Sequence, residues 1–314
     1  MNGGVIDHVG NNQTRVFKEV KALGGELEHL GEETLGAVTD AKVAIYFDWD
    51  NWWAIECSAG PSCELKYKDE IFNYYQALHA MNIPVDFVGV EDELSKYSLV
   101  IAPVLYMTKN GYDEKIRQFV KDGGTFVTTF FSGIADEHDL VITGGYPGKL
   151  RDILGIWVEE SDALAFGAEN AFIYDGKRYP SRLICDLSHL EGAQTLGKYE
   201  LDFYAGMPAV TKHIFGKGNA YYIATRSNAE FYQAFLGNIC KEEGIESLVT
   251  PQEYLEATIR ENENGKFLFL LNHGMDVLTV ALPKAGEELL LNKEYQAGEN
   301  IEIPAKGVCI VKVK

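Results

Sequence analysis

Basic side chains are scarce in this sequence: 28 lysines and arginines stand against 47 aspartates and glutamates, a formal charge of −19. Such a surface repels phosphate backbones and anionic lipid, so we expect neither nucleic acid nor a membrane as partner. No apolar run approaches the roughly 20 residues that cross a bilayer, and residues 1–15 lack the features of a signal peptide. Only five cysteines occur, widely scattered, which argues for a reducing compartment. We therefore expect a cytoplasmic protein.

Sequence patterns for cofactor and metal binding are also scarce. Gly123 and Gly124 follow an expected helix and precede a strand, whereas a phosphate-binding loop needs the reverse order. Cys57 and Cys63 lie in a Gly/Pro/Ser-rich segment, and their spacing matches no common zinc knuckle. The histidines, His138 among them, show no His-x-x-x-His or His-Glu pairing. We expect no cofactor and no metal site.

From residue 41 onward, short β-rich runs alternate with amphipathic stretches. Strands are predicted over 42–48, 84–90, 97–106 and 125–131, and helices over 64–83, 111–124 and 146–156. The third run is apolar nearly throughout, as expected of a parallel strand that is covered on both faces. The alternation predicts an α/β fold with a parallel sheet flanked by helices.

The later residues predict hairpins, one helix and an all-β module. Hairpins are expected at 171–184, with Asp175-Gly176 as the turn, and at 209–225. A helix is predicted over 228–245, with Asn228 as its N-cap. Further strands are expected at 254–262, 266–273, 277–282, 287–292, 300–304 and 307–313. Strands this short predict a small β-sandwich-like domain at the end of the chain.

Residues 1–40 fit neither of these parts. One helix is predicted there, from an apolar stripe at three- and four-residue spacing: Val16, Val20, Leu23, Leu27 and Leu30. No domain of its own accompanies this helix to bury the stripe.

Three of the four tryptophans fall within five positions, at the end of the first predicted strand. Asp48 and Asp50 flank Trp49 there, where open α/β sheets usually place ligands. Large aromatic side chains near a surface anchor interfaces or line sugar sites, because they bury much area at little cost in rotamer entropy. We expect Trp49, Asp50, Trp52 and Trp53 to lie at a subunit interface or at the rim of a substrate pocket. The alternative is that the tryptophans cover the sheet edge, a role for which Trp53 is best suited.

The predicted sheet resembles that of class I glutamine amidotransferases. Their chemistry needs a cysteine on a sharp turn from strand to helix, with a histidine as base. The turn after "LVIAPVL" is "YMTKNG", which contains neither cysteine nor serine. Amidotransferase activity is therefore not expected.

Several segments, taken in order, resemble the middle of the β-galactosidases of glycoside hydrolase family 42. Among them are "VAIYFDWDNWWAIE", "LVIAPVLYMTKN" and "FVKDGGTFVTTFFSGIADEHD". The resemblance implies an enzyme of three parts: a catalytic (β/α)₈ barrel, an amidotransferase-like domain that forms a homotrimer, and a small β-domain. It also implies retaining hydrolysis of terminal β-D-galactosides, in carbohydrate metabolism, by two glutamates on the barrel.

On this resemblance, residues 1–40 are the tail of the barrel, 41–248 the trimerisation domain and 249–314 the C-terminal domain. A barrel needs roughly 250 residues, and neither glutamate has a matching position here, so no catalytic residue is assigned. We expect the chain alone to be inactive, to associate with copies of itself, and to meet a galactoside only together with a barrel. The alternative is a non-catalytic binding or structural protein on a degenerate amidotransferase fold.

Overall fold

A computed structural model describes the chain except residues 1–3, 7, 9, 59 and 110. The chain divides into two compact units, Ala41–Glu246 and Met1–Asp40 together with Ser247–Lys314. The first 40 residues therefore group with the C-terminal β-strands. Among the described residues, none of the helices has the length and apolar content needed to span a lipid bilayer.

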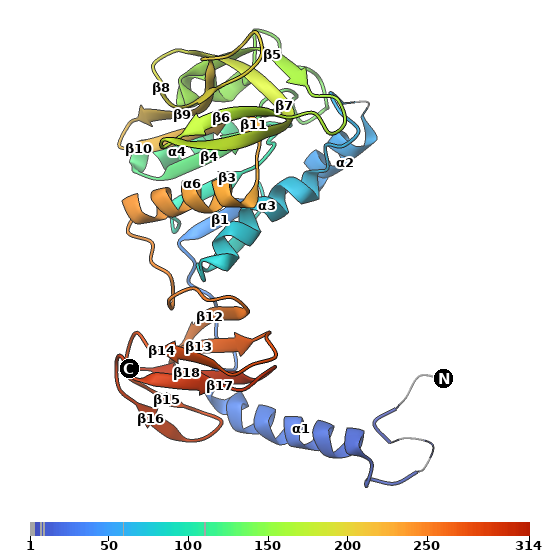
Figure 1. The fold of residues 1–314 in the computed structure, drawn as a ribbon, viewed down its shortest axis with the longest axis vertical. Helices are drawn as coiled ribbons and strands as arrows, with labels where there is room; N and C mark the ends of the chain where they lie inside the picture. Colours follow the sequence, from blue (N-terminus) through green and yellow to red (C-terminus); the bar gives the residue numbers. More distant parts are fainter. Residues whose placement is uncertain (1–3, 7, 9, 59, 110) are drawn as a thin grey trace. The chain divides into compact units, whose positions relative to one another are not determined.

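The unit of residues 41–246 is built around an eleven-stranded mixed sheet (Figure 1). Its parallel part has the order β10-β4-β3-β1-β2, with β1 Val43–Tyr46, β2 Val85–Val88, β3 Leu99–Ala102, β4 Thr125–Thr129 and β10 Gly218–Ile223. Every residue of β1, β3 and β4 is buried, as the apolar runs predict. The four strands predicted between residues 42 and 131 are thereby confirmed.

Helices follow the parallel strands, as the alternating pattern predicts. They are α2 Trp49–Cys57, α3 Tyr67–Ala80, α4 Tyr112–Asp122, α5 Arg151–Leu154 after the short turn Gly148–Leu150, and α6 Ala229–Glu242. Gly123 ends α4 with φ 121°, so Gly123 and Gly124 mark the C-terminal end of a helix. The Asn228 side chain accepts a hydrogen bond from the backbone N–H of Phe231, which confirms the predicted N-cap of α6.

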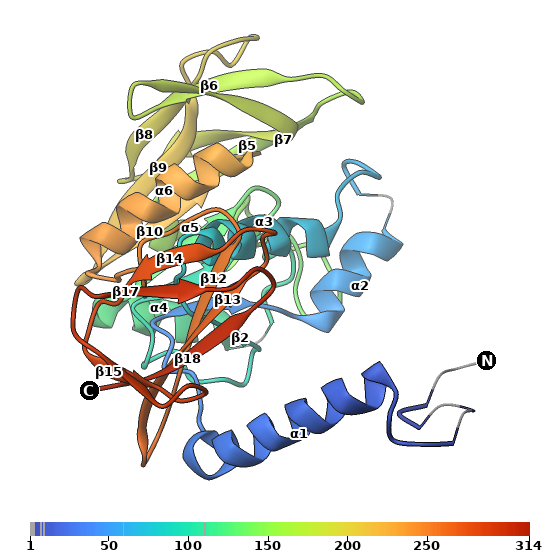
Figure 2. The ribbon, with the colours of Figure 1, turned by 60° about the horizontal axis from the view of Figure 1, so that its bottom comes forward.

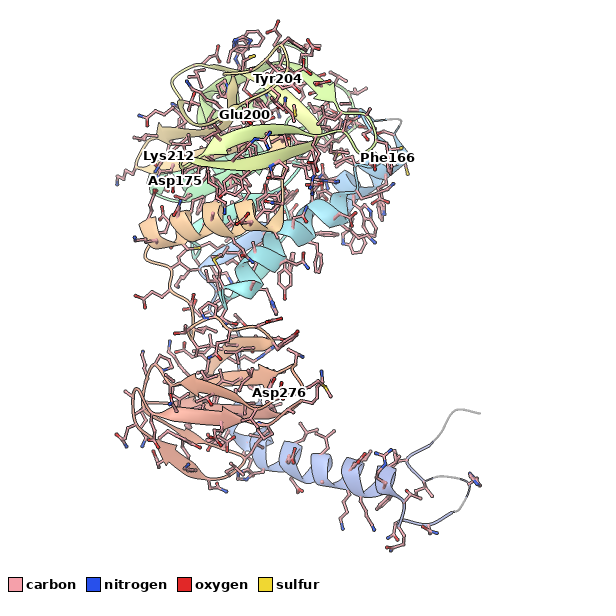
Figure 3. All side chains as sticks on the ribbon, in the orientation of Figure 1. Phe166, Asp175, Glu200, Tyr204, Lys212 and Asp276 are labelled. Carbon is pink, nitrogen blue, oxygen red and sulfur yellow. The ribbon has the colours of Figure 1, made fainter. Side chains whose placement is uncertain are left out.

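The antiparallel strands extend the same sheet. They are β5 Ile156–Ala163, β6 Asn170–Tyr174, β7 Lys177–Leu190, β8 Gln194–Tyr199, β9 Pro208–Phe215 and β11 Thr225–Arg226. β9 pairs with β10, which in turn pairs in parallel with β4 and so joins the two parts. Both predicted hairpins are confirmed, and Asp175 lies at the turn between β6 and β7 with φ 50° (Figure 3). The pattern did not predict β5, β8, or the merging of hairpins and parallel strands in one sheet.

The C-terminal strands form a small all-β arrangement, as predicted. One antiparallel sheet has the order β12-β13-β18-β15-β16, and β14 pairs with β17. The bounds are β12 Leu255–Asn262, β13 Gly265–Asn272, β14 Leu278–Ala281, β15 Gly286–Glu288, β16 Lys293–Tyr295, β17 Asn300–Ile303 and β18 Val308–Val313. The strand predicted over 287–292 is wrong in extent, because the buried Glu288 carboxylate accepts the backbone N–H of Leu291 and turns the chain.

The predicted N-terminal helix is α1 Arg15–Thr34, which begins at an N-cap, Thr14. Figure 2 shows it extending away from the strands of its own unit. Only its last turns are covered there: Leu30 is buried in a cluster with Phe267 and Ile310. The other residues of the predicted apolar stripe are exposed: Val16, Val20, Leu23 and Leu27.

Candidate functional site

The tryptophan segment is a helix that starts directly after β1. Asp48 is the N-cap of α2, and its side chain accepts the backbone N–H of Asp50 at 3.3 Å. The helix places Trp49, Trp52 and Trp53 three and four positions apart, hence on one face. Their rings form a cluster, with centroids 5.2 Å apart for Trp49 and Trp52 and 6.1 Å apart for Trp49 and Trp53.

The three rings differ in exposure. Trp49 and Trp53 are each 56% exposed, whereas Trp52 packs against the hydrophobic core of the unit. The expectation that Trp53 covers the sheet is therefore wrong. The position of Trp52 on the helix directs that ring towards the core, whereas Trp53 faces outward. The Trp52 indole also donates to Glu56 Oε1 at 2.6 Å and lies under the Lys68 ammonium, 4.5 Å from the ring centroid. The interface or pocket role of this cluster stays a prediction.

Lys109 forms ion pairs with both aspartates beside the cluster. Its Nζ lies 2.6 Å from Asp48 Oδ1 and 2.6 Å from Asp50 Oδ2. Burial lowers the pKa of Lys109, but its hydrogen bonds and charge interactions with the two carboxylates outweigh that effect, so the pKa is raised. Asp48 is thus engaged as a helix cap and ion-pair partner, while Asp50 remains exposed beside Trp49.

Asn51, between the tryptophans, ties α2 to the turn after β3. Its side-chain N–H donates to the carbonyl of Val104 at 2.8 Å, and its oxygen accepts the N–H of Met107 at 2.8 Å. Val104 has φ 47°, an uncommon conformation for a β-branched residue. The Thr129 hydroxyl accepts the Val104 N–H and helps to hold it. Asn51 was not among the predicted site residues; a polar residue among apolar neighbours at helical spacing is the signal that could have indicated it.

Replacing Asn51 by alanine should lower the free energy of unfolding by about 3 kcal/mol. The change leaves the buried N–H of Met107 without its partner, at a cost of roughly 1–3 kcal/mol, and removes one of the two hydrogen bonds that the Val104 carbonyl accepts, worth about 1 kcal/mol. Urea unfolding followed by circular dichroism measures the loss. The matched control is Asp50→Ala, one position earlier and exposed, which should cost less than about 1 kcal/mol. A loss below 1 kcal/mol for Asn51→Ala would contradict the bracing role.

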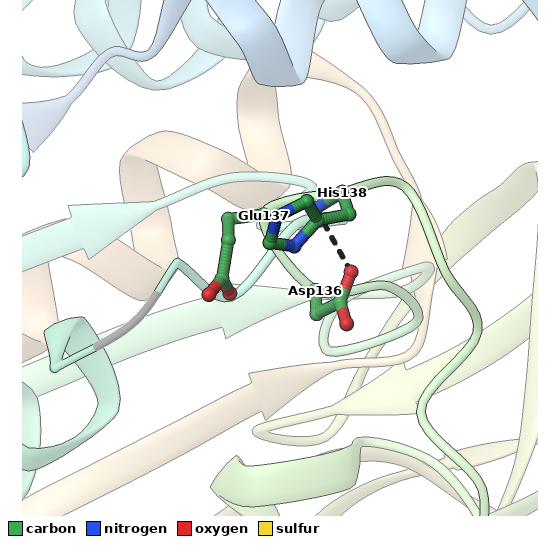
Figure 4. Close-up of side chains that lie close together, drawn as sticks. All are labelled: Asp136, Glu137 and His138. Carbon is green, nitrogen blue, oxygen red and sulfur yellow. Dashed lines mark hydrogen bonds between the residues drawn. The ribbon is translucent and has the colours of Figure 1, made fainter.

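Asp136, Glu137 and His138 form the one group among the described residues whose donor atoms could approach a metal ion together. These atoms lie within 4.8 Å of one another (Figure 4). However, Asp136 Oδ1 already accepts the backbone N–H groups of His138 and Leu140, at 2.9 and 3.1 Å. These hydrogen bonds lower the pKa of Asp136. The group is a turn held by an aspartate, and we assign it no ligand.

Two deeply buried carboxylates have structural partners. Asp186 accepts hydrogen bonds from the hydroxyls of Tyr222 and Ser161 and from the backbone N–H of Phe131. Burial raises its pKa, although these bonds act in the opposite sense. Glu70 forms an ion pair with Arg226. Both carboxylates are thus occupied in holding the fold.

The comparisons with known proteins agree with this architecture. Residues 41–246 match the β-galactosidase trimerisation domain, and residues 254–312 match the β-galactosidase C-terminal domain. Both are domains of glycoside hydrolases. More particularly, the chain belongs to the β-galactosidases of glycoside hydrolase family 42, which confirms the resemblance inferred from the sequence.

Individual relatives show the same correspondence. The β-galactosidase BgaP of Planococcus sp. (strain L4) is 48% identical over 315 residues, covering 98% of this chain and 46% of that protein. The β-galactosidase LacZ of Lactobacillus acidophilus is 46% identical over 291 residues, covering 92% and 44%. The crystal structure of the β-galactosidase from Bacillus circulans sp. alkalophilus matches with a TM-score of 0.96 at 43% identity, covering 99% and 47%. The chain spans about half the length of the curated relatives it matches.

Proposed function

We propose that this chain is the assembly and C-terminal portion of a β-galactosidase that hydrolyses terminal β-D-galactosides with retention. The observation that carries the proposal is the match of residues 41–246 to the trimerisation domain. In this view the two catalytic glutamates belong to a barrel, and the present chain contributes no catalytic residue. Residues 1–40 are the tail of that barrel, and the exposed apolar stripe of α1 supports this. The five cysteines, all free thiols, support a cytoplasmic location.

We also propose that residues 41–248 have an amidotransferase-like fold that has no nucleophile. In such folds the nucleophile occupies a sharp turn directly after a parallel strand. Here β3 is followed by Val104 with positive φ, on a turn braced by Asn51 and Thr129. A valine side chain offers neither a thiol nor a hydroxyl, so the turn is present but cannot supply a nucleophile.

We propose a homotrimer in which Trp49, Trp53 and Asp50 contact a neighbouring subunit at the rim of the galactoside pocket. The exposure of both indoles supports this, because folding of the unit leaves more than half of each ring uncovered. Trp52 holds the cluster in place by packing beneath it. Exposed aromatic clusters of this kind commonly supply much of an interface's binding energy.

Separate changes of Trp49 and Trp52 to alanine test this role. Trp49→Ala should weaken self-association by roughly 2 kcal/mol without lowering the melting temperature measured at a concentration where the chain is dissociated, because its side chain is largely exposed. Trp52→Ala should also lower the melting temperature, because it removes core contacts. Sedimentation velocity and thermal unfolding measure the two effects, with exposed Leu291→Ala in the other unit as control. If both variants lose thermal stability while assembly is untouched, the cluster is ordinary core.

A further inference from the structure

The tryptophan cluster is one end of a longer row of rings on the unit of residues 41–246. From Trp52 the row continues through the Lys68 ammonium onto α3. Phe72 and Tyr75 lie four and seven positions after Lys68, on the same helix face, with their ring centroids 6.3 Å apart. The Tyr75 ring is in turn 5.8 Å from Phe87 on β2.

We name this row the aromatic belt: Trp49, Trp52, Trp53, Phe72, Tyr75 and Phe87.

Folding of the chain leaves the belt largely uncovered. Phe72 and Phe87 are each 52% exposed, similar to the two outer tryptophans. Tyr75 and Trp52 pack against the core and fix the row in position. In the described residues, β2 pairs only with β1, so the belt ends at an open edge of the sheet. Exposed aromatic groups beside an open edge are typical of an interaction surface.

The exposed area suits a protein partner. A whole aromatic side chain presents roughly 200 Å², so four rings that are just over half exposed carry on the order of 400 Å². That is about half of the roughly 800 Å² that each partner contributes to a standard interface. The rings are uncharged, so they offer copies of a chain of formal charge −19 a place to meet with reduced like-charge repulsion.

We propose that a second copy of this chain docks on the aromatic belt, including its Phe72 and Phe87 end. The inference rests on the proposed trimerisation and assigns it a surface. Because a ring of three is closed by heterologous contacts, the belt meets a different surface of the neighbouring copy. The belt is therefore one of the two faces that each subunit uses.

The test introduces a charge at the end of the belt remote from the tryptophans. Phe72→Glu and Phe87→Glu, each in the full chain, should weaken self-association by roughly thirtyfold or more, the effect of losing an interface anchor. Sedimentation velocity over a concentration series measures this. Leu291→Glu, which places the same charge at a 70% exposed position in the other unit, should leave assembly unchanged. Melting temperatures measured at a concentration where the chain is dissociated should stay close to that of the unmodified chain, since both phenylalanines lie largely outside the core.

Hydroxyl-radical footprinting of the unmodified chain gives a measurement that needs no folded variant. Phe72 and Phe87 should be protected at concentrations where the chain is associated and become reactive on dilution. Folded variants that still form trimers, together with reactive Phe72 and Phe87 in the associated unmodified chain, would overturn the belt as a subunit contact and leave the trimer proposal intact. A chain that stays monomeric throughout would overturn both proposals.

Discussion

The 314-residue chain should release no chromophore from a chromogenic β-galactoside above the rate in buffer. Retaining hydrolysis needs two carboxyl groups about 5 Å apart across an open sugar site. The most deeply buried carboxylates of the described residues, Glu70, Asp186 and Glu288, are each engaged in bonds that hold the fold. Glycosidases accelerate their reactions by many orders of magnitude, so the expected difference from an active enzyme is all or none.

A continuous absorbance assay at micromolar chain, beside a full-length β-galactosidase of the same family, makes this measurement. Trace contamination is the main source of a false positive, so any activity should be tested against variants. Glu70→Gln and Asp186→Asn are suitable, because each removes one buried carboxylate. Clear turnover by the unmodified chain that a folded variant abolishes would place catalysis in this chain and contradict the proposed division of labour.

Local patterns predicted much of the fold. The parallel strands are short apolar runs that alternate with amphipathic helices, and both features depend on neighbouring residues alone. The same holds for the Asp175-Gly176 turn, whose residues tolerate positive φ, and for the Asn228 cap. The family resemblance was recognised separately, because it depends on ordered motifs that periodicity does not explain.

Non-local pairings were the part that patterns could not supply. β10 belongs to a predicted hairpin, yet Ala220 lies beside Phe126 of β4 in parallel register. That pairing is set by how the chain packs and has no local signal. The early end of β15 has a similar cause, because the Glu288 carboxylate also accepts the backbone N–H of Ile310.

The candidate site shows the same division. The tryptophans were predicted as site residues from their residue type and close spacing, and the structure shows that the helix brings their rings together. Which ring turns inward depended on the helix that Asp48 caps, and that helix was not predicted. Asn51 acts through partners more than 50 positions away along the chain, so its role required the three-dimensional structure.

The second prediction with a large expected effect concerns assembly: the chain should be a homotrimer in solution. Residues 41–246 match the trimerisation domain, and the exposed rings of this unit offer an apolar surface for a partner. Aromatic contacts are largely insensitive to salt, whereas repulsion between chains of charge −19 is screened by it. Raising the ionic strength should therefore strengthen the association. Dissociation by moderate salt would indicate an interface held mainly by ion pairs, contrary to this proposal.

Sedimentation equilibrium of the full chain is the most direct test that this chain is an assembly portion. The proposal predicts a mass near three times 35.0 kDa that is retained on dilution through the micromolar range. A single species at 35.0 kDa up to the highest soluble concentration would contradict it.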